Sequence, residues 1–177
     1  MAVYEFEGRV PKIGPGTYIH PSAEVIGLVT LGVECWVGPG ARIRGDYGEV
    51  VVGDGTSIED NCVVHARPGE STHIGRHVTL GHGCVVHNAT VSDYAVIGMG
   101  AVVSDWAMVG EWAVIGEGAV VTQRQDIPEQ HIAVGVPAKV LENRWVSEGY
   151  QDEWMRFKNT YRDLARRYPS GLKRIDG

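Results

Sequence analysis

Three histidines, His65, His82 and His87, are the residues of this sequence whose type and spacing best suit joint chemistry. A catalytic zinc ion prefers three protein ligands and an open fourth position for water, and neutral imidazole is one of its usual ligands. A single histidine is more often a hydrogen-bonded surface residue than a ligand, and we interpret the other four in that way: His20, His73, His77 and His131. The set of three predicts a metal site, provided that the fold brings the imidazoles together.

A six-residue repeat supplies the elements that would position these histidines. An aliphatic residue recurs every six positions between residues 19 and 127, and a small residue often follows four positions later. The period is interrupted by a three-residue insertion after Ile43, a four-residue insertion after Val64 and the loss of one residue after Val86. A helix needs spacing near 3.6 and a simple strand spacing of 2, so a sustained period of six predicts a coil of short strands that turns at each repeat. Three hexads per coil make a triangular prism, with these starts pointing inward: Ile19, Val25, Leu31, Val37, Ile43, Val52, Ile58, Val64, Ile74, Leu80, Val86, Val91, Ile97, Val103, Val109, Ile115, Val121 and Ile127.

All three cysteines, Cys35, Cys62 and Cys84, fall on the small inward position of the repeat. They are therefore predicted to be buried thiols of the core. Cys62 and Cys84 would lie on neighbouring coils about 4.8 Å apart. That spacing alone does not exclude a disulfide.

The repeat ends near Pro137, and a different pattern follows. Aromatic and aliphatic residues then alternate at spacings of three and four, which predicts an amphipathic helix that starts after Gly149 and ends at Pro169, packed on a flank of the prism. The stripe consists of Trp154, Phe157, Tyr161, Leu164 and Tyr168. We expect a β-helix domain over residues 1–140, with the helix and tail over 141–177 belonging to the same unit.

The turn count places the histidines on the prism. Arg44, His65 and His87 each follow a hexad start by one residue, three repeats apart, so they should form an outward-facing ladder on one face. His82 belongs to the preceding hexad and lies around a corner. A neighbouring prism could present its own His82 to the ladder, and a head-to-tail contact repeated three times predicts a homotrimer with sites at its interfaces.

Composition limits the partners of the chain. Its 177 residues carry a formal net charge of −6, and a footprint for nucleic acid or anionic lipid would need clustered basic residues. The one basic cluster, Arg162, Arg166 and Arg167, has Asp163 within it and is interpreted as a solvated helix face. No segment approaches the apolar length of a membrane span, and the first residues do not resemble a targeting signal. A cytoplasmic protein is expected.

The stretch from Ile43 to Val103 resembles the gamma-class carbonic anhydrases, especially the short members without an acidic loop, and the resemblance extends over residues 10–168. Its most specific parts are RGD at 44–46, the histidine that ends DNCVVH at 65, and the histidines at 82 and 87. The resemblance implies a left-handed β-helix whose three histidines bind the metal across a trimer interface. It also implies that Arg44 and Asp46 pair at that interface and that Tyr161 lies close to the site.

The sequence departs from this family at two places. Tyr47 and Pro68 replace the two glutamates that the archetype uses around the metal and for proton transfer. Glu59 stands where the family usually has a glutamine, and it either accepts a proton or is an inert surface residue. Asp60 should stack under His82, where a carboxylate could orient the imidazole ring.

The resemblance implies reversible hydration of carbon dioxide to bicarbonate by a hydroxide bound to Zn²⁺, with Fe²⁺ or Co²⁺ as alternatives. Two other functions stay open. Hexapeptide acyltransferases share the repeat scaffold and a GVPAK stretch, here residues 135–139, and use a lone histidine as general base toward acyl-CoA, which would leave two of the three histidines unexplained. A non-catalytic assembly or metal-binding module is the third possibility, favoured by the missing proton shuttle.

Overall fold

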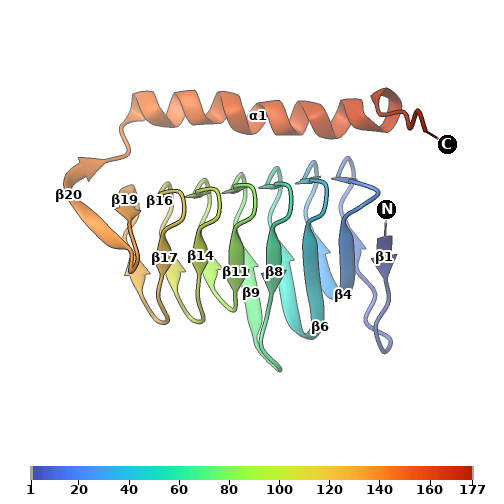
Figure 1. Ribbon diagram of the computed structural model, residues 1–177, viewed down its shortest axis with the longest axis horizontal. Helices are drawn as coiled ribbons and strands as arrows, with labels where there is room; N and C mark the ends of the chain where they lie inside the picture. The colour runs from blue at the N-terminus through green and yellow to red at the C-terminus, as the bar shows by residue number, and fades with distance from the viewer. Residues whose placement is uncertain (1, 177) are drawn as a thin grey trace.

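The computed structural model describes residues 2–176, which form a β-helix with one long helix beside it (Figure 1). Two faces of the prism belong to one sheet, in which the long strands β4 and β6 turn the corner: β1 (Ala2–Tyr4), β2 (Lys12–Ile13), β4 (Glu24–Leu31), β6 (Arg42–Val52), β8 (Val63–His65), β9 (Ser71–Ile74), β11 (Val85–His87), β12 (Thr90–Val91), β14 (Val102–Val103), β15 (Met108–Val109), β17 (Val120–Val121) and β18 (Asp126–Ile127).

The third face is a separate sheet, made of β3 (Tyr18–Ile19), β5 (Trp36–Val37), β7 (Ser57–Ile58), β10 (Thr79–Leu80), β13 (Val96–Ile97), β16 (Val114–Ile115), β19 (His131–Val134) and β20 (Lys139–Trp145). Successive coils pair in parallel along this face, and the last pair, β19 with β20, is antiparallel. We call this eight-stranded sheet the helix-bearing face, because α1 (Glu148–Gly171) contacts its strands β3, β5 and β7.

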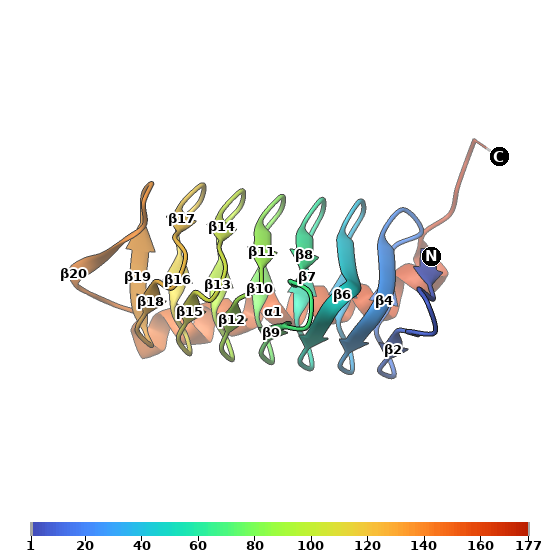
Figure 2. The same ribbon diagram turned by 90° about the horizontal axis from the view of Figure 1, so that it is seen from below.

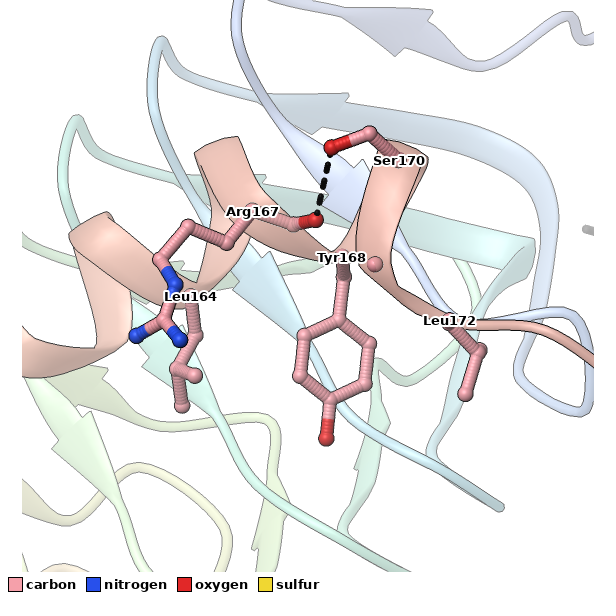
Figure 3. Close-up of a pocket in the computed structure, with 6 residues that line it drawn as sticks. Leu164, Arg167, Tyr168, Ser170 and Leu172 are labelled. Carbon is pink, nitrogen blue, oxygen red and sulfur yellow. Dashed lines mark hydrogen bonds between the residues drawn. The ribbon is translucent and has the colours of Figure 1, made fainter.

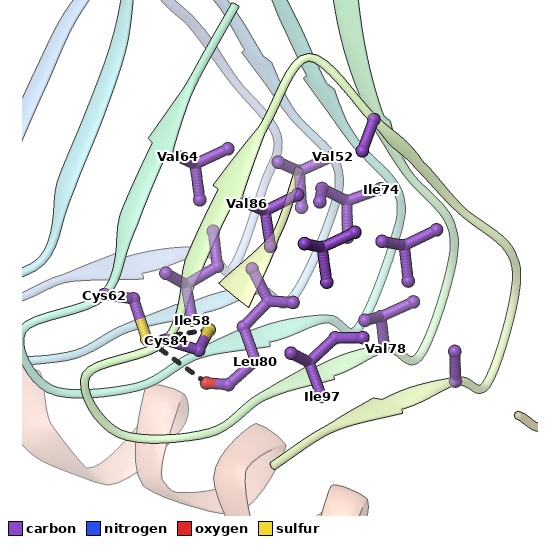
Figure 4. Close-up of a cluster of buried hydrophobic side chains, with 14 of the residues drawn as sticks. Val52, Ile58, Cys62, Val64, Ile74, Val78, Leu80, Cys84, Val86 and Ile97 are labelled. Atoms are coloured by element: carbon purple, nitrogen blue, oxygen red, sulfur yellow. Dashed lines mark hydrogen bonds between the residues drawn. The ribbon is translucent and has the colours of Figure 1, made fainter. Parts of the chain in front are cut away.

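The hexad prediction is confirmed in the core. All eighteen aliphatic hexad starts are buried, as are the small residues that follow them. Figure 4 shows one part of this core. At the corners the chain takes left-handed dihedral angles, with φ of 59° at Asn61 and 49° at Asn88, a region that asparagine tolerates better than most residues. The six-residue period therefore encodes both the inward side chains and the turns between strands.

The three cysteines are buried, free thiols, as predicted. The Sγ atoms of Cys62 and Cys84 lie 3.7 Å apart inside the prism (Figure 4). The pKa of the Cys84 thiol is raised, because that thiol donates a hydrogen bond to Cys62 and is shielded from water. Both side chains are fully buried and contribute to packing.

The two insertions in the repeat have different structures. The three-residue insertion after Ile43 is absorbed into β6, where Val50 provides an additional buried side chain. The four-residue insertion after Val64 forms the turn between β8 and β9, which extends beyond the neighbouring coils in Figure 1. Neither insertion changes which face the later hexads occupy.

Helix α1 runs along the prism axis and returns toward the first coils (Figures 1 and 2). It begins earlier than predicted, because the hydroxyl of Ser147 accepts a hydrogen bond from the backbone N–H of Tyr150 at 3.3 Å and caps the first turn. It also continues past Pro169, and its last turn closes with the N–H of Leu172 donating to the carbonyl of Tyr168 at 3.0 Å. Among residues 2–176, no helix combines the length and apolar character that a membrane crossing requires.

The buried side of α1 differs from the predicted stripe. Tyr161 and Tyr168 pack on Trp36, with ring centroids 6.0 and 4.6 Å apart, as an amphipathic helix would. Phe157, however, is 54% exposed, whereas its neighbour Lys158 is only 2% exposed. The helix is thus rotated relative to the sequence prediction, and a lysine occupies the centre of the contact.

The basic cluster of α1 is not simply a solvated face. Both Arg162 and Arg166 form ion pairs with Glu34, from the corner between β4 and β5, and the guanidinium Nε of Arg162 lies 3.1 Å from the carboxylate. These two partners lower the pKa of Glu34 to about 2. The pairs attach the C-terminal half of α1 to the early coils.

Candidate functional site

The predicted ladder on the face formed by β6, β8 and β11 is present. Arg44 pairs in register with His65, and His65 with His87, on successive coils. The Nδ1 atom of His65 lies 3.2 Å from the Nε2 atom of His87. The two imidazoles are therefore hydrogen-bonded to each other.

A carboxylate closes each end of this histidine pair. Asp46 lies 2.9 Å from Nε2 of His65, and Asp105 lies 2.5 Å from Nδ1 of His87. Arg44 pairs with Asp46 within the same chain. Burial raises the pKa of Asp46, and hydrogen bonds from His65 and Arg44 lower it. The hydrogen bonds together have the larger effect, so the pKa of Asp46 is lowered overall. We refer to the residues Asp46, His65, His87 and Asp105 as the histidine chain.

Asp105 is a member of this cluster that sequence reasoning missed. Arg67, from the turn after β8, donates to its carboxylate at 2.6 and 2.9 Å and lowers its pKa. The repeat could have revealed it, because Asp105 follows the hexad start Val103 by two residues and so lies one coil beyond His87. Both ring nitrogens of His65 and both ring nitrogens of His87 have partners within the histidine chain.

His82 lies around the corner, on the helix-bearing face, as the turn count predicts. Its Nδ1 atom is 2.6 Å from the carboxylate of Asp60, and its Nε2 atom is 3.0 Å from the carboxylate of Glu59. The His82 side chain is 45% exposed. The imidazole is therefore oriented by two acidic groups and still accessible to a substrate.

Glu59 is buried, with 5% of its surface exposed, and is not the inert surface residue that one interpretation allowed. Burial raises the pKa of its carboxyl group, although His82 and a hydrogen bond from Tyr161 act in the opposite direction. The pKa of Tyr161 is raised by its own burial and by the Glu59 carboxylate. Tyr161, which belongs to α1, thus lies close to His82, and it contacts the carboxylate of Glu59, which in turn contacts His82.

An apolar groove of about 550 Å³ extends from His82 between α1 and the helix-bearing face. We call it the helix groove. Its floor consists of strands β10, β13, β16 and β19, and its wall is the N-terminal half of α1. The lining comprises Glu59, Thr79, Gly81, His82, Val96, Ile97, Gly98, Met99, Val114, Ile115, Gly116, Glu117, Ile132, Val134, Tyr150, Trp154, Phe157 and Tyr161.

Lys158 is buried next to this site and was also missed. Its Nζ atom lies 3.1 Å from the hydroxyl of Thr79 and 3.4 Å from the carbonyl of Ala95, and it lies 5.7 Å from the ring centroid of Trp154. Burial lowers its pKa to about 7, against a smaller opposite effect of Glu59. The helical spacing could have revealed it, because residue 158 lies four positions after Trp154 and three before Tyr161.

A separate hollow at the other end of α1 has no comparable chemistry. Leu164, Arg167, Tyr168, Ser170, Gly171 and Leu172 line it (Figure 3). Arg167 pairs with Asp163 at 3.2 Å, and its carbonyl accepts a hydrogen bond from Ser170. Because no acid and base face each other across these lining residues, the helix groove with His82 is the stronger site.

The three predicted metal ligands do not converge within one chain. The structure brings His65 and His87 together and places His82 with Glu59 and Asp60 on another face. Across residues 2–176, no group of three histidine, cysteine or acidic side chains is arranged to hold a metal ion.

Comparison with known proteins identifies the family. No protein-family model matches the chain. The carnitine operon protein CaiE of Salmonella typhi is 36% identical over 173 residues, which cover 97% of this chain and 86% of the relative. The chain belongs to the CaiE-like family of hexapeptide-repeat transferases.

Solved structures agree with this assignment of the CaiE-like chain. A Bacillus cereus protein named as a candidate acetyltransferase is 30% identical, with a TM-score of 0.92 over 97% of this chain and 98% of that one. A hexapeptide transferase family protein from Anaplasma phagocytophilum is 32% identical, with a TM-score of 0.88 over 94% and 98%. The predicted left-handed β-helix of hexapeptide repeats is confirmed.

These relatives correct the expected activity of the CaiE-like chain. The prediction of a carbonic anhydrase acting on carbon dioxide and bicarbonate was wrong, because the relatives are CaiE and hexapeptide transferases. The predicted cofactor, Zn²⁺ with Fe²⁺ or Co²⁺ as alternatives, was wrong as well, because it was expected for the carbonic anhydrase reaction and the relatives are transferases. The error has a physical cause: proteins with one fold can carry different activities, so the repeat that predicts the prism does not predict the reaction.

Proposed function

We propose that this CaiE-like protein transfers an acyl group from a coenzyme A thioester to a hydroxyl or amine acceptor, with His82 as the general base. The observation that carries the proposal is the position of His82, which is held by Asp60 at the end of the helix groove. The names of the relatives, which include transferases and a candidate acetyltransferase, support the same reaction class.

Asp60 prepares His82 for this role. A carboxylate on Nδ1 favours the tautomer that carries its proton there, so Nε2, which faces the Glu59 carboxyl group at 3.0 Å, is the ring nitrogen that can accept a proton. The 2.6 Å contact also fixes the direction of the ring. His82 is the predicted histidine with the exposure that a substrate requires.

The proposed reaction proceeds in two steps with balanced protons. His82 accepts a proton through Nε2 from the acceptor hydroxyl or amine as its oxygen or nitrogen attacks the thioester carbonyl. The tetrahedral intermediate then collapses, the carbon–sulfur bond breaks, and the His82 imidazolium returns the proton to the leaving thiolate. Glu59, at 3.0 Å from Nε2, stabilises the imidazolium that forms in between.

The remaining predicted residues have structural explanations in this proposal. His65 and His87 are bound to each other and to Asp46 and Asp105, so they are part of a network that connects coils. Arg44 holds Asp46 in that network. The acyltransferase hypothesis therefore no longer leaves two histidines without a role.

The test uses acetyl-CoA as donor and measures the release of free coenzyme A. Carnitine, from whose operon the Salmonella relatives take their name, carries a hydroxyl group and is the first acceptor to try. We expect His82→Ala to lower the turnover number by at least about 100-fold. His73→Ala is the matched control, since His73 is an exposed histidine on β9 bound to Ser71. Equal turnover in both variants would contradict the proposal.

The homotrimer and the cytoplasmic location remain predictions. The trimer was predicted from the position of His82 around a corner from His65 and His87 and from the resemblance to the gamma-class carbonic anhydrases. Its mass would be three times the 19.2 kDa of one chain. Light scattering on the purified protein measures this mass directly. A monomer at working concentration would contradict the assembly without affecting the assignment of His82.

A further inference from the structure

We propose that the helix groove binds the hydrocarbon chain of the acyl group, so that the preferred donors are medium-chain thioesters and not acetyl thioesters. This inference rests on the proposed function for the chemistry at His82. The groove itself, its lining and its direction are features of the described chain.

The lining is suited to a hydrocarbon chain. The floor presents aliphatic side chains from successive coils, among them Val96, Val114 and Ile132, and the wall presents Trp154 and Phe157 from α1. Of the acidic and basic side chains in the lining, Glu59 and His82 belong to the proposed catalytic group, and Glu117 is exposed to solvent. A chain anchored by its thioester carbonyl at His82 would therefore extend over apolar surface.

The groove is also long in one direction. Its floor crosses four consecutive strands, β10, β13, β16 and β19, which pair in register from one coil to the next. Coils of such a prism are about 4.8 Å apart, so three steps span about 14 Å. That length exceeds an acetyl group and accommodates a chain of octanoyl to dodecanoyl size.

Five backbone N–H groups of the groove lining are already hydrogen-bonded. They donate to carbonyls of the next coil at 2.8 to 3.0 Å and belong to Thr79, Gly81, Val96, Gly98 and Gly116. The pantetheine arm of coenzyme A contains amide groups, which would lose hydrogen bonds to water at a cost of about 1–3 kcal/mol each if they entered without partners. The acyl chain incurs no such cost, so it is the better occupant.

The experiment compares the binding of acetyl-CoA, octanoyl-CoA and coenzyme A to the full chain by calorimetry. Each methylene that enters the groove should strengthen binding about fourfold, so octanoyl-CoA is expected to bind at least about 30-fold more tightly than acetyl-CoA. Equal affinities of the two thioesters would overturn the proposal. If acetyl-CoA still supported turnover in that case, the proposed function would stand and the groove assignment alone would fail.

Two variants test the location of the chain. Val114→Phe fills the floor, and Phe157→Ala removes part of the wall; both should reduce the preference for octanoyl-CoA by about 10-fold or more while acetyl-CoA binding changes little. Val102→Phe is the matched control, because Val102 is an equally half-buried valine on β14, outside the lining. An unchanged preference in Val114→Phe and Phe157→Ala, with folding verified by circular dichroism, would overturn the assignment.

A neutral probe separates the groove from the reaction. 1-Octanol carries the chain without the thioester, and it avoids the repulsion that octanoate would meet at Glu59 and Asp60. One possible result is that 1-octanol binds, that Val114→Phe abolishes this binding, and that no coenzyme A compound binds. This result would support the groove as a hydrocarbon site and contradict the proposed function. Absence of binding by 1-octanol and by octanoyl-CoA would overturn the groove proposal.

Discussion

The Nδ1 atom of His82 lies 2.6 Å from the carboxylate of Asp60, one coil below it on the same face of the prism. This contact joins two adjacent coils at the one predicted histidine that is free of the histidine chain. It orients the imidazole toward the helix groove and selects the proton position on its ring.

Replacing Asp60 with asparagine tests this contact. Asp60→Asn keeps the shape of the side chain but removes its charge and introduces an amide donor, so the tautomer with its proton on Nδ1 is no longer favoured. We expect the turnover number for acyl transfer to fall by about 100-fold or more, with a smaller change in the Michaelis constant. Asp163→Asn, at an exposed carboxylate on α1, should leave both constants unchanged. A normal turnover number in Asp60→Asn would show that Asp60 has no part in positioning His82.

Replacing Asp105 should affect stability and not activity, because we assign the histidine chain a structural role. Asp105→Ala leaves Nδ1 of His87 and the guanidinium of Arg67 without their shared acceptor. We expect the free energy of unfolding to fall by about 1–2 kcal/mol, measured by urea titration, while acyl transfer at saturating substrate is retained. Loss of turnover in a folded Asp105→Ala protein would instead place the histidine chain in the reaction.

Lys158 predicts a pH dependence of stability. Its pKa is lowered from 10.5 to about 7 in the folded protein, so between these values the unfolded chain binds more protons than the folded one. The stability of the native state should therefore rise with pH from about 7 to 10.5, and the destabilisation by this lysine is greatest below pH 7. Lys158→Met removes the titrating group and should increase the free energy of unfolding at pH 7 by an amount on the order of a few kcal/mol.

Thermal unfolding of the native protein and of Lys158→Met at about pH 6, 8 and 10 checks this prediction. The advantage of the variant should shrink as the pH rises across this range. Lys173, an exposed lysine beyond α1, provides the matched control through Lys173→Met, which should show no such trend. A constant difference between the native protein and Lys158→Met at all three pH values would contradict the assigned titration.

Glu34 tests how α1 is held on the prism. Glu34→Gln removes the charge that faces Arg162 and Arg166, so the C-terminal half of the helix should detach more often. We expect cleavage by trypsin within α1 to become about threefold to tenfold faster at neutral pH, where the ion pairs are intact. Because the folded pKa of Glu34 is lowered to about 2, the stabilisation is present above its usual value of 4.5 and is lost as the pH falls toward 2. Equal cleavage of the native and variant proteins would show that aromatic packing alone holds α1.

Several features of this protein could be predicted from its sequence because they depend on local period. The spacing of residues such as Val64 and Val86 determined which side chains enter the core, and it placed His65 under His87 and Asp60 under His82. Each strand pairs in register with the strand of the next coil. Counting residues along the repeat therefore assigns each later position to a face of the prism and to a coil.

The tertiary structure alone decided what the outward-facing residues meet. Whether Phe157 or Lys158 faces the prism depends on the rotation of α1, which is set by contacts of Lys158 with Thr79 and of Tyr161 with Trp36. The helix groove likewise exists because α1 returns over β10 to β19, although the helix begins far along the chain from the first of these strands. The repeat predicts which side of a strand a residue occupies. The burial, pKa and function of an outward-facing side chain depend on the element that packs against that side.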